Sequence, residues 1–362
     1  MATRTKQITL DEIQETFREQ YKRIYDYGHE LLRANVGSSV CIQVQRSPDF
    51  DNEAQTSSMT NYCIFQKIYV CLEACKQSFQ YCRSFIGLDG CFLKTPQVGQ
   101  FLTAIGWDPN DQMLPIAYVV VEDETKDSWT WFLNHLTSDI GIERMGKSTF
   151  MSDQQNGLLP AYEDAILEVD NQFYVRHLYR NFRKRYWSRS RFAFNSKVDT
   201  LVNNMSKSFD SAIVDVREKP IVMMLEKIRV KLMTRWEENR ELAQNYPGTI
   251  LLKIRMKLER MSRSAGQWQP YWSVAQKYEG LDLEPFVANC YKKEAYLKCY
   301  ELVIHPLNGP DLRERIAHGD IMPPPYRRSS HRPGTLPTVP DPPKPPLPPQ
   351  TGRKEYRAQR EY

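Results

Sequence analysis

Residues 85–123 read FIGLDGCFLKTPQVGQFLTAIGWDPNDQMLPIAYVVVED, with three β-rich runs divided by turn signals. The first run closes on Asp-Gly. The last, residues 113–123, is almost continuously apolar, as in a central strand buried on both faces. Between the second run, residues 99–108, and the third, the residues Asp-Pro-Asn-Asp-Gln are a strong turn signal. The stretch therefore predicts three consecutive antiparallel strands.

Further apolar runs and helical patterns surround these three strands. The expected elements are a short apolar run at 68–74, a helix at 127–137 capped by Asp127 or Ser128, a strand at 148–153, a helix at 156–169 and an apolar run at 171–179. Three strands followed by helix, strand and helix predict an α/β (α+β) fold with a mixed sheet.

Longer helical patterns lie toward both ends of the chain. Residues 10–34 carry apolar and aromatic residues at helical spacing, and Gly37 is a stop signal. Residues 212–240 form the longest pattern, with Pro220 suited to a first turn. Residues 286–304 predict another amphipathic helix.

The bulk composition is that of a folded protein. Of the 362 residues, 41% are hydrophobic and 26% are charged, and the length is typical of roughly two domains. The formal net charge of +5 and the pI near 8.6 permit a nucleic-acid partner without demanding one. The N-terminal residues lack the apolar core of a secretory signal, and no apolar run is long enough for a membrane span. We therefore expect no membrane association.

Eight cysteines are spread over the chain, and none forms a Cys-x-x-Cys pair. Cys71 and Cys75 have the spacing of one helical face. Because most of the cysteines lie beside hydrophobic residues, we interpret them as reduced, buried thiols of an intracellular protein rather than as a disulfide framework. A zinc site is the alternative, which the lack of paired Cys/His spacing disfavours. No zinc is expected.

Residues 171–198 combine basic and aromatic residues and contain no acid. We call this range the basic segment. Its basic residues are Arg176, Arg180, Arg183, Lys184, Arg185, Arg189, Arg191 and Lys197. Such a segment is either a solvated face over a packed edge or a surface that contacts phosphates, with aromatic rings available for stacking.

Proline dominates the C-terminal residues, since twelve of the 23 prolines lie between positions 323 and 349. This composition predicts a disordered or polyproline-II tail from residue 322 onward. The tail is either inert or a ligand for an SH3-like or WW-like domain.

Two aspartates stand at the ends of predicted strands: Asp89 in the first run, and Asp153 just before a helix. Carboxylates at the ends of neighbouring strands can share two divalent cations about 4 Å apart, which activate a water or hydroxyl in phosphodiester cleavage. Hard oxygen ligands suit Mg²⁺ or Mn²⁺. The alternative for each aspartate is a turn residue or a helix cap.

The segments around these aspartates resemble, in order, the Mutator-like element (MULE) transposase domain of plants: LDGCFLK, LTAIGWDPNDQMLPIAYVVVEDETKDSWTWFL, TFMSDQQNGLLPA and YVRHLYRNFRK. The resemblance extends over most of residues 15–330. It implies a ribonuclease-H-like core, with a mixed five-stranded sheet and helices on its faces. It also implies cut-and-paste DNA transposition at terminal inverted repeats by three acids and a divalent metal, in which Asp89 matches the first acid and Asp153 the second.

Lys207, within NNMSKSFDS, occupies the position that matches the family's third acid, normally a glutamate. A lysine about 4 Å from a divalent ion is repelled by several kcal/mol even at an effective dielectric near 20. It could pair with Asp89 or Asp153 instead. We therefore expect two-metal catalysis to be severely impaired. Asp210, roughly one helical turn away, is an alternative third ligand.

Further departures from the family lie on either side of this lysine. Tyr174-Val175-Arg176-His177 stands where the family has Cys-x-x-His, so we interpret His177 as a packed or hydrogen-bonded core histidine. The helical insertion that the family places after the basic segment is largely missing. The linker YWSVAQKYEGLDLEP has no Cys or His for the family's SWIM-type zinc finger.

We divide the chain into a helical segment with a loop (1–60), the transposase-like domain (61–240), a C-terminal helical segment (241–321) and the proline-rich tail (322–362). The favoured hypothesis is a nuclear, transposase-derived DNA-binding protein with impaired catalysis. RNFRKRYWSRSR is a weak basic nuclear signal. The alternatives are a non-enzymatic nuclear adaptor or transcription regulator, a still-active metal-dependent transposase, and a gene fragment that does not fold stably. Self-association stays open.

Overall fold

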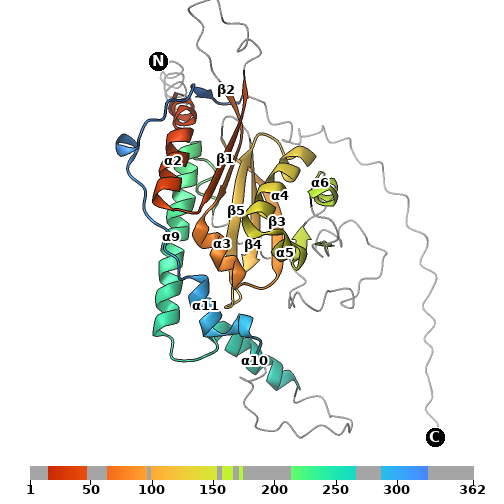
Figure 1. Ribbon diagram of the computed structural model, residues 1–362. Helices are drawn as coiled ribbons and strands as arrows, with labels where there is room; N and C mark the ends of the chain where they lie inside the picture. The colour runs from red at the N-terminus through yellow and green to blue at the C-terminus, as the bar shows by residue number, and fades with distance from the viewer. Residues whose placement is uncertain are drawn as a thin grey trace, which may run out of the picture. The chain divides into compact units, whose positions relative to one another are not determined.

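A mixed β-sheet with helices on both faces forms the centre of the computed structural model (Figure 1). The structure describes residues 15–46, 63–95, 99–152, 157–165, 171–173, 213–265 and 287–324. These residues all belong to the unit Met1–Arg327. The second unit, Arg328–Tyr362, lies outside the described residues, as does nearly all of the expected proline-rich tail.

The sheet contains eight strands within these ranges. They are β1 (Ser39–Arg46), β2 (Cys63–Cys71), β3 (Phe85–Phe92), β4 (Gln100–Trp107), β5 (Met113–Val121), β6 (Thr149–Ser152), β7 (Asn171–Phe173) and β8 (Ile321–Met322). Their order is β1-β2-β5-β4-β3-β6-β7, and β8 pairs with β2.

The strands β5-β4-β3-β6-β7 form the mixed five-stranded sheet that the family resemblance implies. β3, β4 and β5 are consecutive and antiparallel, as predicted, whereas β6 runs parallel to β3 and β7 parallel to β6. The α/β fold class with a mixed sheet is thereby confirmed. β2 extends the sheet at the β5 edge, with β1 and β8 beside it. Neither β1 nor β8 was among the predicted elements.

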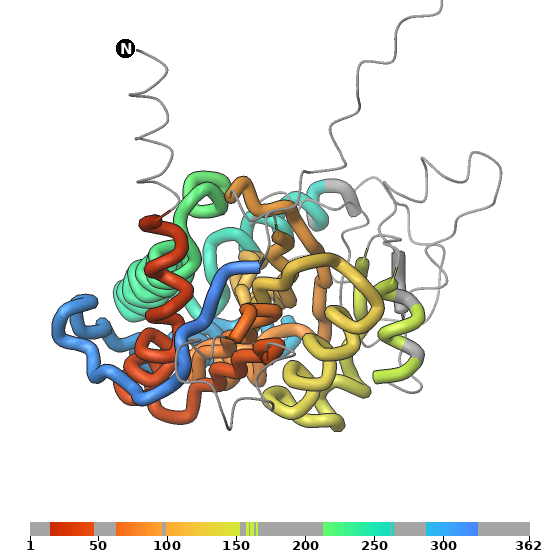
Figure 2. Tube along the Cα trace, turned by 90° about the horizontal axis from the view of Figure 1, so that it is seen from above, coloured from red at the N-terminus to blue at the C-terminus, as the bar shows by residue number. Residues whose placement is uncertain are grey.

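Helices lie against both faces of this sheet. They are α2 (Ile24–Ala34), α3 (Glu73–Gln80), α4 (Lys126–Ile140), α5 (Ile142–Gly146), α6 (Leu158–Ala165), α9 (Ile221–Asn245), α10 (Leu252–Ala265) and α11 (Lys293–Cys299), with short 3-10 turns at Asn289–Tyr291 and Pro310–Leu312. α2 and α9 lie side by side against one face, and α4 and α6 lie against the other (Figure 1). Figure 2 shows the strands between these two groups from above.

Successive residues of a strand face opposite sides of the sheet, so the strands contribute side chains to the helix layers on both faces. On the α4 face, Tyr69 of β2 donates a hydrogen bond to Asp139 of α4 at 2.7 Å. On the α9 face, Tyr118 of β5 is buried, and this burial, together with the charges of Cys75 and Glu226, raises its pKa. The sheet is therefore covered on both sides, which explains the nearly continuous apolar sequence of β5.

Two predicted helix starts are corrected by the structure. The N-cap of α4 is Thr125, whose hydroxyl oxygen accepts a hydrogen bond from the backbone N–H of Ser128 at 3.2 Å, rather than Asp127 or Ser128. Pro220 is the N-cap of α9, so it precedes the helix instead of lying in its first turn. In both cases the helix itself is confirmed and only its boundary moves.

Two predictions about helical residues also change. The helix expected over 286–304 is limited to a 3-10 turn and α11, which ends at Cys299. Cys71 and Cys75 do not share a helix, because Cys71 ends β2 and Cys75 lies on α3. All eight cysteines are free thiols, five of them buried. The pattern at 10–34 is confirmed over its described part, which is helical from residue 15 to 34 apart from Arg23.

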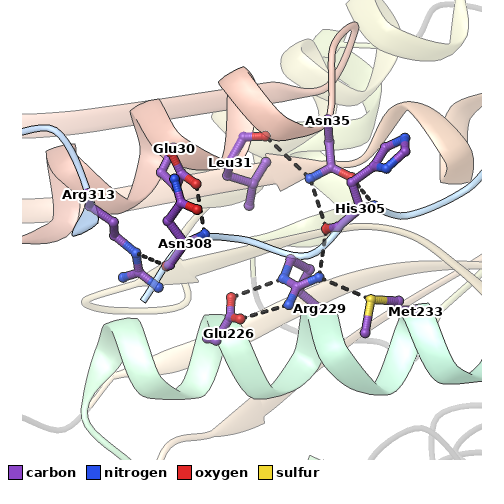
Figure 3. Close-up of polar contacts among 9 residues, drawn as sticks. All are labelled: Glu30, Leu31, Asn35, Glu226, Arg229, Met233, His305, Asn308 and Arg313. Atoms are coloured by element: carbon purple, nitrogen blue, oxygen red, sulfur yellow. Dashed lines mark hydrogen bonds and ion pairs between the residues drawn. The ribbon is translucent and has the colours of Figure 1, made fainter. Parts of the chain in front are cut away.

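Residues 301–309, which we call the C-terminal segment, pass between α2 and α9 without helical structure (Figure 3). The side chain of Asn35, at the end of α2, accepts a hydrogen bond from the backbone N–H of His305 at 2.8 Å. Arg229 of α9 donates to the His305 carbonyl at 2.8 Å. The two helices thus hold the same residue of this segment through its backbone.

Glu30 of α2 gives the C-terminal segment a pH-dependent contact. Hydrogen bonds from Arg33, and then one from the backbone N–H of Asn308 at 2.8 Å, lower the pKa of Glu30 from 4.5 to about 2. Since the folded pKa is the lower one, the contact stabilises the fold above pH 4.5, and this stabilisation is lost as the pH falls toward 2.

Glu30→Gln is therefore expected to lower the free energy of unfolding by about 2 kcal/mol at neutral pH. This is less than the full pKa difference would give, because the Arg33 partner is half-exposed and water screens the pair. Urea denaturation of both proteins measures the difference, which should shrink as the pH falls below 4.5. A difference that stays constant with pH would contradict this assignment.

Candidate functional site

Asp89 is the fifth of the eight residues of β3, so it lies within the strand and not at its end as predicted, and its side chain is half-buried. Its Oδ1 accepts a hydrogen bond from the backbone N–H of Gly90 at 2.9 Å, and its own carbonyl accepts one from the hydroxyl of Thr103 at 3.4 Å. Asp89 is opposite Thr103 on β4, which in turn is opposite Tyr118 on β5. Paired residues share a face, so Asp89 lies on the α9 face of the sheet.

The pairing of β6 with β3 concerns the segment that leads to the second predicted acid, Asp153. β6 is parallel to β3, and Leu88 is opposite Ser152, the last residue of β6. Asp89 and Asp153 are the next residues of the two segments, and Asp153 lies outside the described residues. The described register therefore ends one residue short of the predicted pair.

The turn that precedes α9 is attached to the end of β3. The backbone N–H of Lys94 donates to the carbonyl of Arg217 at 3.0 Å, and its ammonium group pairs with Glu218 at 2.8 Å. Lys207 and its predicted substitute Asp210 precede this turn by a few residues and lie outside the described residues. The chain thus returns to the end of β3 soon after the position of the third acid, at Lys94, which is five residues beyond Asp89.

A further carboxylate at this edge, Glu124, was not predicted. A Cβ added to Gly90 would meet Leu102 at 2.8 Å and the carboxylate oxygens of Glu124 at 3.4 Å, so the glycine leaves room for this side chain. Trp129 of α4 donates its indole N–H to Glu124 at 3.0 Å. Neighbouring residues of a strand face opposite sides, so Glu124 meets the α4 face at Gly90, whereas Asp89 faces α9. The structure therefore assigns Glu124 to holding α4 at this edge.

The rest of the predicted site lies outside the described residues. This applies to Asp153, Lys207, His177, Arg176, Arg180, Arg183, Lys184, Arg185, Arg189 and Arg191. In the part of the chain that the structure describes, no three His, Cys, Asp or Glu side chains form a group that could hold a metal ion. No helix there is long and apolar enough to cross a membrane. The described geometry thus defines the position of Asp89 and the edge of the sheet around it.

Residues 85–181 match the family model of the MULE transposase domain. The match begins at the first residue of β3 and includes all of β4, β5, α4, β6 and β7. It therefore contains the whole mixed five-stranded sheet and both of the predicted acids, Asp89 and Asp153. No curated protein matches this chain at a significant level.

Proposed function

We propose that this MULE transposase-domain protein, which is transposase-derived, binds DNA. We further propose that Lys207 severely impairs its metal-dependent cleavage. One observation carries the proposal: β6 ends directly before Asp153, and its last residue, Ser152, is paired with Leu88, the residue before Asp89 on β3. The turn that follows Lys207 is hydrogen-bonded to Lys94, just beyond the end of β3. Adjacent acids on two neighbouring strands suit a phosphodiester-cleaving site.

Asp89 and Asp153 would hold Mg²⁺ or Mn²⁺ in this proposal. The half-buried Asp89 carboxylate supplies a hard oxygen donor of the kind that these ions prefer. The parallel register between Leu88 and Ser152 supports a second donor beside it. A bound ion would activate a water or hydroxyl for phosphodiester cleavage. His177 would be a structural histidine, and no zinc takes part.

Lys207 lowers the metal affinity of this site in two ways. It removes one anionic ligand, and it adds a cation that competes with the metal for the aspartates. We therefore propose a protein that has kept the fold of its family and lost most of the chemistry. Nuclear location and recognition of terminal inverted repeats are parts of this proposal, and the Lys/Arg-rich residues 176–191 would contact the phosphates.

The direct test restores the third acid. Lys207→Glu is expected to raise the affinity for Mn²⁺ by about one to two orders of magnitude, because one substitution removes a repulsive charge and adds a ligand. Isothermal titration of the full chain measures this affinity. Lys147→Glu, at the exposed C-cap of α5, makes the same change in net charge away from the site and should leave the affinity unchanged.

The role of Asp89 is tested in the same background. Adding Asp89→Asn to Lys207→Glu should abolish the gain in Mn²⁺ affinity. If Lys207→Glu and Lys147→Glu have the same affinity for Mn²⁺, the proposed metal site is wrong. The absence of metal binding would then be attributed to the helical insertion that is largely missing from this chain.

DNA binding through the basic segment predicts a particular dependence on salt. Replacing Arg183, Lys184 and Arg185 with alanine is expected to reduce the slope of log affinity against log salt by about 2 to 3, since each phosphate contact contributes about 0.9. Fluorescence anisotropy of a short labelled duplex at several salt concentrations measures the slope. A control variant with Lys22, Lys147 and Lys231 changed to alanine should keep it. An unchanged slope in the first variant would favour the adaptor hypothesis.

A further inference from the structure

A cavity of about 880 Å³ lies at the N-terminal end of β3. Its lining comes from residues 80–84 before β3, from Arg144 of α5, from residues 247–249 before α10, and from the beginning and face of α11. Asp89 is four residues beyond Phe85, on the order of 13 Å along the strand. The cavity is therefore separate from the candidate metal site.

Positive side chains dominate the lining of this cavity. They are Arg83, Arg144, Lys292, Lys293 and Lys298. Among the described residues that line it, the only acid is Glu294, which is exposed to solvent. Five cations minus one carboxylate leave an excess of four positive charges, so an anionic occupant would be favoured.

Arg83 is the most deeply buried of these cations, with 2% of its surface exposed. Its guanidinium lies over the rings of Trp107 at 5.2 Å and Tyr291 at 5.3 Å and pairs with Asp111. Asp111 is shared with Lys257 at 3.2 Å, so one carboxylate balances two cations. The Nε and one Nη of Arg83 are buried without a hydrogen-bond partner in the described structure. Such donors are costly unless an acceptor reaches them.

Arg144 and two lysines add positive charge without an acid beside it. Arg144 donates to the Ser84 hydroxyl at 3.0 Å and to the Cys82 carbonyl at 2.7 Å. Within the described ranges no carboxylate forms an ion pair with Arg144, Lys292 or Lys298. Burial lowers the pKa of Arg144.

We propose that this cavity binds phosphate groups of a DNA strand, as a second contact surface beside the basic segment. Phosphodiester oxygens carry negative charge and are strong acceptors, so they match the excess of cations that line the cavity. The inference rests on the proposed DNA-binding function, and it places a second DNA contact at the far end of β3 from the cleavage edge. Inorganic phosphate has the same chemistry and is distinguished by the test below.

The test removes the two lysines that are least involved in the fold. Lys292→Gln with Lys298→Gln in the full chain is expected to lower the affinity for a short duplex about tenfold at low salt, and the salt slope by about 2. Lys22→Gln with Lys231→Gln removes the same charge away from the cavity and should change neither quantity. Melting temperatures of both variants check that the fold is kept. Lys298→Gln alone, at an exposed position, should show about half of the change in the salt slope.

The outcomes separate this inference from the proposed function. If the cavity variant behaves like its control while the Arg183, Lys184 and Arg185 variant still loses salt slope, DNA binding stands and the cavity assignment is overturned. If inorganic phosphate raises the melting temperature of the wild type but not of the cavity variant, and DNA affinity is equal in both, the cavity takes free phosphate and the DNA assignment is overturned. If the wild type binds no DNA at all, the proposed function itself fails.

Discussion

Asp108→Ala is expected to lower the free energy of unfolding by roughly 4 kcal/mol at pH 5. Asp108 is fully buried in the turn between β4 and β5. Its Oδ1 accepts from the backbone N–H groups of Asn110 at 2.9 Å and Gln112 at 2.7 Å, and its Oδ2 accepts from the hydroxyl of Tyr300 at 2.7 Å. Alanine would leave three donors without an acceptor in the interior, each at a cost of about 1 to 3 kcal/mol. Urea denaturation measures the loss.

Asp108→Asn is the matched control, because its amide keeps the shape and an acceptor oxygen for both N–H groups. Burial raises the pKa of Asp108 from 3.8 to about 6 against the opposing effect of its hydrogen bonds. Since the folded state holds the proton more tightly, the contribution of this carboxyl to stability is complete below pH 3.8 and is lost as the pH rises to about 6.

The stability of Asp108→Asn relative to the wild type should therefore rise by up to about 3 kcal/mol between pH 4 and pH 7. A relative stability that stays constant over this interval would mean that the three hydrogen bonds outweigh burial and that Asp108 is ionised throughout.

Trp236→Ala is expected to cost about 4 kcal/mol of unfolding free energy, the range found when a buried aromatic side chain is truncated. Trp236 lies on α9 with 1% of its surface exposed, and its ring meets Tyr300 edge to face with 5.1 Å between centroids. The substitution would leave a cavity between α9 and the residue that also holds Asp108. Thermal or urea unfolding monitored by circular dichroism measures the effect.

Trp236→Phe separates packing from polar effects at the same position. The indole N–H of Trp236 is buried and has no hydrogen-bond partner within the described structure, so its loss should cost nothing. Phenylalanine keeps most of the ring volume, and we expect a loss of about 1 kcal/mol. Equal losses for the alanine and phenylalanine variants would show that the ring packing is not the main contribution.

Local sequence patterns predicted the elements whose own residues indicate how they are buried. The nearly continuous apolar run of β5 follows from helices on both faces, and the turn at Asp108 was marked by its own residues. β1 was missed although Val40, Ile42 and Val44 alternate with polar residues in a way typical of a strand.

Tertiary contacts explain the predictions that failed. Residues 300–304 continue the helical pattern of α11, yet the chain leaves the helix because Asn35 and Arg229 bind the backbone of His305. No local pattern contains this information. The same holds for Glu124, whose position depends on Gly90 of another strand and on Trp129 of α4. Asp89 was predicted to end its strand, whereas β3 continues to Phe92, because pairing with β4 extends three residues past Asp89.

The fixed position of His305 between α2 and α9 sets an order of events during translation. α2 is made early, yet Asn35 meets its partner His305 only 270 residues later. β2 likewise receives β8 only when Ile321 and Met322 have been made. In a nascent chain paused before His305, the surfaces of α2 and α9 that this segment covers in the folded protein are still exposed, so a chaperone could bind there. The ribosome must release nearly all of the described chain before those surfaces are covered.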